Sequence, residues 1–382
     1  MKYIDEFHHE ISQHLYIQDE EALDIVLATA AANFIEGDPV WLLLVGPSGG
    51  GKTELLNMFQ DSNHALTISK FTKNTLLSGY KNLPTGQDLL FQMKDKLVII
   101  KDLAPILELG KDEQREILAD LRDAYDGYVS KRWGTGQTKT WKGKFGLIAA
   151  STNALDKKWK LYSELGERFI RVNLETDAKA QTEFAMSRIG SEELFRDKLR
   201  ELGCRFLDHY QKSAQIQLPL TPGPITSLIS RVGILTARLR TPVMRNANKD
   251  VEVLPIPEVG TRLSKQLMRL AQSSAVMCES PEVTIYGEYR LALRVAVDSI
   301  PVKRTLILSS LLDGCSTTQE ISRNTSLPQT TISYELGDMR MLGVITESSS
   351  GSGWEILEEI EFELRKTGIV ARLSRKVTPI AA

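Results

Sequence analysis

The chain has 382 residues, with 47 lysines and arginines against 49 acidic residues. This length is enough for two or three domains and a large buried core. Hydrophobic residues make up 42% of the chain and charged residues 25%, as is ordinary for a globular protein. Because the formal net charge is only −2, the composition excludes binding to nucleic acid through overall charge, and any such contact must come from local basic patches.

Cysteine usage and hydropathy exclude further classes. The three cysteines, Cys204, Cys278 and Cys315, are far apart and form no CxxC pair, which argues against a disulfide framework and against a cysteine-based metal centre. No apolar run approaches the roughly 20 residues that a membrane helix needs, and the N-terminus lacks the apolar centre of a signal peptide. We therefore expect a cytoplasmic protein that does not associate with a membrane.

The first predicted element is a helix within residues 1–40. Apolar residues recur there at helical spacing, from Ala22 to Ala31, and the pattern stops near Gly37. The helix leads directly into the apolar run 41–45. We expect it to be a packing element, and one that could supply the edge of an adenine pocket.

Residues 46–53 read Gly-Pro-Ser-Gly-Gly-Gly-Lys-Thr and meet the spacing GxxxxGKT in full. An apolar strand precedes them and helix-forming residues follow, which is the order of a P-loop: backbone N–H groups surround phosphates, the lysine reaches the β- and γ-phosphates, and the threonine holds Mg²⁺. A glycine-rich surface turn that happens to carry a lysine is the weaker alternative. The expected ATP site comprises Gly46, Pro47, Ser48, Gly49, Gly50, Gly51, Lys52, Thr53 and Glu54.

The apolar run 97–100 ends in Lys101 and Asp102, as expected of a parallel strand that is buried on both faces. The Asp102 carboxylate should lie at the carboxyl edge of the sheet beside the P-loop, where open α/β sheets bind ligands and where a Walker B aspartate helps to hold Mg²⁺. Two interpretations stay open. Either Asp102 holds the metal and no obvious base follows, or Asp102 stands at the base position and Lys101 replaces the metal-linked acid.

A helix predicted over 112–126 is followed by two β-rich segments, 128–133 and 138–144, around a glycine-containing turn. This pattern predicts a hairpin. Its cations and two tryptophans, with no acids among them, favour contact with the phosphates of single- or double-stranded DNA, whereas the alternative is a solvated hairpin whose lysines only discourage edge pairing. The basic residues are Lys131, Arg132, Lys139, Lys142 and Lys144, and the aromatic residues are Trp133 and Trp141.

The next buried strand, predicted over 145–153, ends in polar residues. Asn153 or Thr152 is placed there to orient the attacking water near a γ-phosphate. Further on, Arg168 precedes a last strand and is a candidate arginine finger, which stabilises charge on the transferred phosphoryl group. The alternative role for Arg168 is a salt bridge at a helix end.

Residues 176–300 lose the strand pattern, and long helical patterns interrupted by prolines replace it. We expect an α-helical lid. Within it, an amphipathic helix begins near Gly260, and Arg262 at its start could fold onto the γ-phosphate and report the nucleotide state.

Residues 301–357 are expected to form a winged helix-turn-helix. Two helices, a capping box formed by Thr317 and Glu320, a third helix from Pro328 and a two-stranded hairpin follow one another. The third helix would enter the DNA major groove, although a winged helix used only for protein contacts is an open alternative. Its DNA-contacting candidates are Gln329, Thr330, Thr331, Ser333 and Tyr334. Residues 358–382 continue as a helix and a basic tail.

With these motifs in order, the chain resembles AAA+ ATPases of the superclade that includes the minichromosome maintenance helicases. It looks most similar to ATP-binding proteins carried by phages and mobile elements, which share the Gly-Lys-Thr-Glu sequence of the P-loop. The resemblance covers roughly residues 20–357. It implies an α/β core at 1–175, a ring that is usually a hexamer, and an Arg168 that acts on ATP bound by the neighbouring subunit.

The leading functional hypothesis is an ATP-driven DNA motor or replication initiator that uses ATP and Mg²⁺, with Mg²⁺ on Thr53 and Asp102. Asn153, Arg168 and Arg262 would complete hydrolysis. One alternative is a nucleotide-switched DNA-binding regulator. Another is the ATPase component of a transposition or defence system, which recruits a partner protein.

Overall fold

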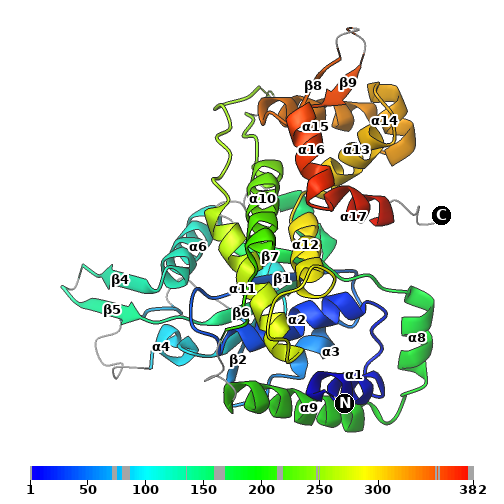
Figure 1. Cartoon of the computed structure of the whole chain (residues 1–382). Coiled ribbons are helices and arrows are strands. Elements are labelled where there is room, and N and C mark those ends of the chain that lie inside the picture. Colours follow the sequence, from blue (N-terminus) through cyan, green and yellow to red (C-terminus); the bar gives the residue numbers. More distant parts are fainter. Residues whose placement is uncertain are drawn as a thin grey trace. The chain divides into compact units, whose positions relative to one another are not determined.

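The computed structural model describes residues 2–70, 75–79, 87–134, 136–158, 168–212, 218–246, 248, 250–348, 351 and 353–376. The chain divides into two compact units, which are considered separately here. The first comprises Met1–Thr221 and Arg269–Leu291, and the second comprises Pro222–Met268 and Ala292–Ala382. Figure 1 shows the elements in chain order.

The first unit is built on a five-stranded parallel sheet with the order β2-β3-β6-β1-β7. This confirms the predicted α/β class. The strands are β1 Trp41–Val45, β2 Ala65–Ile68, β3 Leu97–Ile100, β6 Gly146–Ser151 and β7 Phe169–Asn173. Every residue of β1, β3 and β6 is buried, because helices cover both faces of the sheet, and such strands need continuous apolar runs.

Helices of the first unit flank this sheet. They are α1 Tyr3–Ser12, α2 Glu20–Ala32, α3 Lys52–Asn57, α4 Leu89–Met93, α5 Ala104–Glu108, α6 Lys111–Tyr125, α8 Ala178–Met186 and α9 Glu192–Lys212, with the 3₁₀ turn η1 Asn153–Lys158. An antiparallel pair, β4 Tyr128–Arg132 and β5 Thr138–Lys142, forms the predicted hairpin. Two helices, α11 Thr261–Met277 and α12 Glu288–Asp298, contribute residues to both units.

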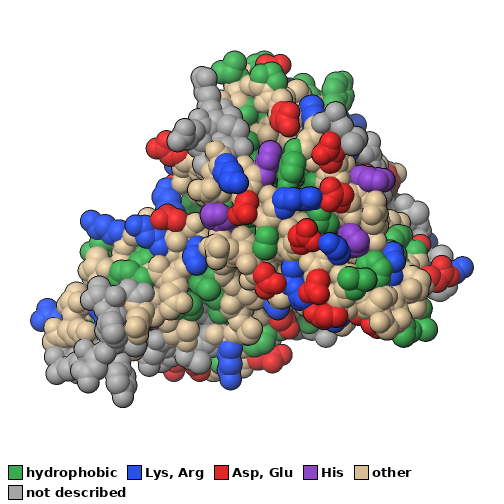
Figure 2. Space-filling model, turned by 90° about the horizontal axis from the view of Figure 1, so that it is seen from below, with side chains coloured by type: hydrophobic (Ala, Val, Ile, Leu, Met, Phe, Trp, Pro, Cys, Tyr) green, Lys and Arg blue, Asp and Glu red, His purple; other side chains and the backbone are tan. Residues whose placement is uncertain are grey.

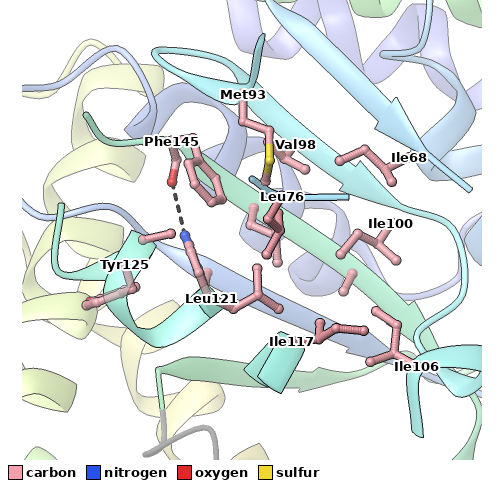
Figure 3. Packing of buried hydrophobic residues seen from close by; sticks show 14 of the residues in the cluster. Ile68, Leu76, Met93, Val98, Ile100, Ile106, Ile117, Leu121, Tyr125 and Phe145 are labelled. Atoms are coloured by element: carbon pink, nitrogen blue, oxygen red, sulfur yellow. Dashed lines mark hydrogen bonds between the residues drawn. The ribbon is translucent and has the colours of Figure 1, made fainter. Parts of the chain in front are cut away.

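The main core of the first unit lies on one face of the sheet. Figure 3 shows Val98 and Ile100 of β3 facing Ile117 and Leu121 of α6, whose apolar residues recur at helical spacing. At one end of this cluster, Trp41 Nε1 donates a 3.0 Å hydrogen bond to the carbonyl oxygen of Phe145. The bond pairs the indole N–H, which would otherwise be buried without a partner.

Helices α8 and α9 belong to the first unit, whereas the predicted boundary at 176 placed them in a helical lid. The Phe206 ring of α9 lies 5.1 Å from Phe7 of α1 and 6.3 Å from Phe59. The face that carries α1 and α9 at the bottom of Figure 1 is seen in Figure 2, where acidic and basic side chains are intermixed. Among the described residues, no helix is both long and apolar enough to cross a membrane.

The second unit is a helical region with a small hairpin. Its elements are α10 Gly223–Arg240, α13 Val302–Leu312, α14 Thr318–Thr325, α15 Gln329–Met341, β8 Ile345–Glu347, β9 Trp354–Ile356, α16 Glu358–Lys366 and α17 Ile369–Lys376. The predicted capping box is present, since Thr317 accepts a hydrogen bond from the Glu320 N–H and Glu320 accepts one from the Thr317 N–H. Ile307, Ile332, Leu336 and Val344 belong to one buried cluster that unites these elements.

Candidate functional site

The glycine-rich loop 46–51 connects β1 to α3, as predicted. Gly49 and Gly51 have positive φ values of 76° and 81°, a conformation that glycine adopts with little cost. The Gly50 N–H donates to the Pro47 carbonyl at 3.2 Å, and the Leu55 N–H donates to the Gly51 carbonyl at 3.0 Å. The loop is therefore a tight, internally bonded turn that ends at the first turn of a helix.

Lys52 is folded against this loop. Its ammonium group donates to the Gly46 carbonyl at 2.9 Å and to the Pro47 carbonyl at 2.6 Å, and only 8% of the residue is exposed. Burial lowers the pKa of Lys52, and the negative charge of Asp102 partly opposes that shift. The charge thus rests on neutral carbonyl oxygens, and an anion can compete for it.

Two backbone hydrogen bonds bring three polar segments together at the carboxyl edge of the sheet. The Gly46 N–H donates to the Ser151 carbonyl at 3.3 Å, and the Leu103 N–H donates to the Ala150 carbonyl at 2.8 Å. Because β6 lies between β1 and β3, its end joins the P-loop to the segment that carries Asp102. Asn153 follows directly as the first residue of η1 and is exposed.

The side chains expected to hold Mg²⁺ are exposed at this edge. Thr53 is exposed in the first turn of α3, and Asp102 is exposed after β3. Asp102 accepts a hydrogen bond from the Ala104 N–H at 2.9 Å, while Lys101 donates to the side-chain oxygen of Gln60 at 3.2 Å. A hydroxyl and a carboxylate are hard oxygen donors of the kind Mg²⁺ prefers, so these residues fit the metal.

Glu54 is engaged elsewhere. It accepts hydrogen bonds from Arg196 of α9, with a shortest distance of 3.0 Å. The structure thus gives Glu54 a partner in the helix that packs against α3.

A small pocket adjoins the loop on its other side. It is lined by Gly50, Gly51 and Leu55, by residues between α1 and α2, by the segment after β7 and by one residue of α8: Tyr16, Ile17, Gln18, Leu174, Glu175, Thr176 and Gln181. Buried Asp19 fixes the N-terminal segment here, because its carboxylate accepts from the Ala22 N–H at 3.1 Å and from the Glu175 N–H at 3.0 Å. The sequence predicts the edge of an adenine pocket at the helix from Ala22 to Ala31, whereas the residues that line this pocket, Tyr16 to Gln18, precede that helix.

Arg168 lies at the opposite edge of the sheet. It directly precedes Phe169, whose register partner is Trp41 at the start of β1, so the length of β7, roughly 16 Å, separates it from the P-loop edge. Its guanidinium group donates to Asp126 at 2.6 Å and lies 5.7 Å from the ring centre of Tyr125. The structure therefore does not bring Arg168 to the P-loop of its own chain. Gly166 and Glu167, the preceding residues of the predicted finger motif, lie outside the described residues.

Arg262, at the start of α11, belongs to the second unit and lies 3.5 Å from Glu258.

Sequence reasoning gave no role to Arg171 in the middle of β7. Its side chain is 3% exposed and binds both carboxylate oxygens of Asp156, at 2.5 and 3.2 Å. Its Nε donates to Asn173 at 2.8 Å. An arginine within a buried strand was the available signal, because a buried charge needs a partner.

The hairpin β4–β5 separates its cations onto two faces. Lys131 and Lys139 are opposite each other in the register and are partly buried in ion pairs. Lys131 binds Glu116 at 3.0 Å and Asp120 at 3.1 Å, and Lys139 binds Asp88 at 2.8 Å.

The other face of the hairpin is exposed. It carries Arg132 and Lys142, and Tyr128 is 50% exposed there. The Lys142 ammonium lies 5.7 Å from the Tyr128 ring centre. Trp141, in contrast, is a core residue that is 1% exposed, and the partly buried Trp133 packs against the main cluster. Burial therefore leaves Trp141 unavailable for DNA contact, whereas the Tyr128 ring is accessible.

In the second unit, α15 presents a polar surface at its N-terminal end. Gln329, Thr330, Ser333 and Tyr334 are exposed, and Thr331 is partly buried. The Tyr334 ring lies 5.4 Å from the guanidinium carbon of Arg245, which itself pairs with Asp338 at 2.5 Å.

Comparison of the sequence with models of known protein families found no match, and comparison with curated proteins found no relative either. Among the described residues, no cluster of three or more histidine, cysteine or acidic side chains is suited to hold a metal.

Proposed function

We propose that this chain is an ATP-dependent DNA-binding motor of the AAA+ kind, helicase-like or a replication initiator, that works as a homo-oligomeric ring. The observation that carries the proposal is the junction of β1, the loop 46–51 and α3, with the end of β6 bonded both to that loop and to the segment of Asp102. Such a junction presents backbone N–H groups and a lysine to phosphates.

Each residue has a separate task in this proposal. Lys52 would leave the two carbonyl oxygens that it binds in this structure and take the β- and γ-phosphates. Mg²⁺, when bound, would neutralise charge on the phosphates, and Thr53 and Asp102 would hold it. Asn153 would orient the attacking water.

The same proposal assigns Arg168 to the ATP site of the neighbouring subunit. Its position at the far edge of the sheet leaves it unable to serve its own P-loop, which is what an arginine finger supplied in trans requires. Asp126 would have to release it.

The proposed DNA contacts lie in two places. The exposed hairpin face offers Arg132, Lys142 and Tyr128 for phosphates and stacking. The elements from α13 to β9 follow the order of a winged helix-turn-helix, in which α15 would present its exposed N-terminal residues to the major groove.

The test is ATP turnover by the purified chain with and without DNA. We expect DNA to stimulate hydrolysis and Lys52→Ala to reduce kcat by at least about 100-fold. Gel filtration with nucleotide should show an oligomer. A chain that binds no nucleotide, or that stays monomeric when saturated with it, would contradict the proposal.

A second candidate is a nucleotide-switched DNA-binding regulator, with little mechanical work. One observation favours it: Lys101 stands where a pair of acids would place the first, and its ammonium is turned to Gln60. An assay on a forked duplex separates the two, because ATP-dependent unwinding would exclude a mere switch.

A further inference from the structure

The pair formed by Arg171 and Asp156 connects two strands that are not neighbours. Asp156 lies in η1, directly after β6, and Arg171 lies in β7. Since β1 runs between β6 and β7, these strands are about 10 Å apart. The pair therefore links β7 to the turn after β6, on the two sides of β1, the strand that leads into the loop 46–51.

We call the pair of Arg171 and Asp156 the brace, because its hydrogen bonds fix the orientation of both side chains. The guanidinium of Arg171 binds both oxygens of Asp156, and Asn173, two residues further along β7, accepts from Nε. Two parallel hydrogen bonds define the orientation of both groups. Arg171 is almost fully buried, while Asp156 is 38% exposed at its side chain, so the arginine is the anchored member and the turn is the positioned one.

The turn that is held in this way carries the predicted water-orienting residue. Asn153 begins the 3₁₀ turn that contains Asp156, and the Leu155 N–H donates to the Thr152 carbonyl at 3.1 Å. Leu155 is buried in the main core. The start of η1 is thus fixed by β6, its middle by the core and its outer side by Arg171.

We infer that Arg171 and Asp156 are positioning residues for phosphoryl transfer, which fix Asn153 against the P-loop without touching the nucleotide. This inference rests on the proposed ATPase function. Displacement of a catalytic group by about 1 Å can reduce a rate by about 100-fold, whereas nucleotide binding depends on the loop and Lys52. Loss of the brace should therefore reduce kcat and leave affinity for ATP intact.

The experiment compares Asp156→Asn, Asp156→Glu and Arg171→Lys with the wild type and Lys52→Ala. The readouts are ATP dissociation constants from fluorescence titration, kcat, KM and thermal melting. We expect Asp156→Asn and Arg171→Lys to lower kcat at least tenfold, with KM and the dissociation constant within about twofold of wild type. Asp156→Glu, which keeps the carboxylate, should recover much of the loss.

Glu10→Gln is the matched control, because it removes the negative charge that pairs Glu10 of α1 with Arg205 of α9, and neither residue belongs to the proposed ATP site. It should keep the wild-type kcat.

Wild-type kcat in Asp156→Asn and Arg171→Lys, or a parallel loss of ATP affinity and thermal stability, would overturn the inference. The proposed function would still stand in that case, provided that Lys52→Ala remained inactive. A wild-type chain that bound no ATP would overturn both.

Discussion

The two edges of the parallel sheet hold their cations differently. At the carboxyl edge, Lys52 rests on the neutral carbonyl oxygens of Gly46 and Pro47, and burial lowers its pKa. At the amino edge, Arg168 is bound by the carboxylate of Asp126 and lies near the face of Tyr125. A cation on neutral acceptors can be transferred to an incoming anion at little cost, whereas a carboxylate-bound cation must first lose a charged partner.

In the proposed ATPase, Lys52 would therefore be available to nucleotide, whereas Arg168 would have to be released from Asp126 before it could act. The carboxyl edge presents Thr53, Asp102 and Asn153, all exposed, around the loop. In the proposed ring, the approach of a neighbouring subunit would be the event that frees Arg168. Four experiments test how far this difference between the cations extends.

Large losses of turnover are expected at both edges of the sheet, and Asp102→Asn tests the carboxyl edge. Loss of the carboxylate should lower Mg²⁺-dependent ATP turnover by about 100-fold or more, because the metal neutralises charge that develops on the phosphates. Lys101→Ala is the matched control, and it should change turnover little, since the Lys101 ammonium binds Gln60. Steady-state turnover across a Mg²⁺ series measures both. Equal losses in the two variants would show that Lys101 has a direct part in the site.

At the amino edge, Arg168→Ala and Asp126→Ala should behave differently. We expect Arg168→Ala to lower kcat by about 100-fold or more, as for loss of an arginine finger. Asp126→Ala should retain most turnover and lower the melting temperature modestly, because Asp126 is half exposed and only frees the arginine. Turnover measured over a range of protein concentrations tests the contribution from a neighbouring subunit. If both variants lost turnover and stability in parallel, Arg168 would be only a structural partner of Asp126.

The contrast between the edges also explains what the sequence could predict. The loop 46–51, β1 and β3 each depend on residues that are adjacent in the sequence. The GxxxxGKT motif predicts the loop, and the apolar runs 41–45 and 97–100 predict the two strands. The two β-rich segments around a glycine-containing turn likewise predicted β4 and β5. The partners of Lys131 come instead from α6, and the partner of Arg168 is Asp126, directly after α6. No local pattern shows which cation meets which acid.

The order of the strands in the sheet is the second feature that could not be predicted from the sequence. The pair of Arg171 and Asp156 depends on the position of β1 between β6 and β7 in the sheet. The order of these strands along the chain does not reveal that position. Tertiary packing also decided that Trp141 is core and that α9 joins the sheet unit, since hydrophobic spacing gives a buried face but not the element that covers it.

The hairpin β4–β5 also has both ion-paired and exposed cations, and substitutions there should have smaller effects, on DNA binding. Arg132→Ala and Lys142→Ala should each weaken DNA binding by roughly 3- to 10-fold and reduce the salt dependence of the affinity by about one phosphate contact. Lys131→Ala is the control, whose main effect should be on stability, because Lys131 pairs with Glu116 and Asp120. Fluorescence anisotropy at several salt concentrations measures the affinities. A larger loss in Lys131→Ala would place the DNA on the inner face.

The smallest effect concerns pH and follows from the lowered pKa of Lys52. The protonated ammonium binds phosphate, so ATP affinity should fall as pH rises through this pKa, at a lower pH than for an ordinary lysine. The free energy of unfolding of the nucleotide-free protein should instead rise with pH between the lowered pKa of folded Lys52 and the ordinary pKa of lysine. In that range the unfolded chain still holds the proton that the folded chain has lost.

Titration of the wild type with ATP between about pH 7.5 and 10 should therefore show an alkaline loss of affinity that Lys52→Met lacks. Arg168 cannot produce it, since an arginine keeps its charge over this range. Affinity that stayed constant to the upper end of the range would mean that Lys52 keeps its proton despite burial. Lys52 and Arg168 would then both remain charged over this pH range, and they would differ only in the groups that bind them.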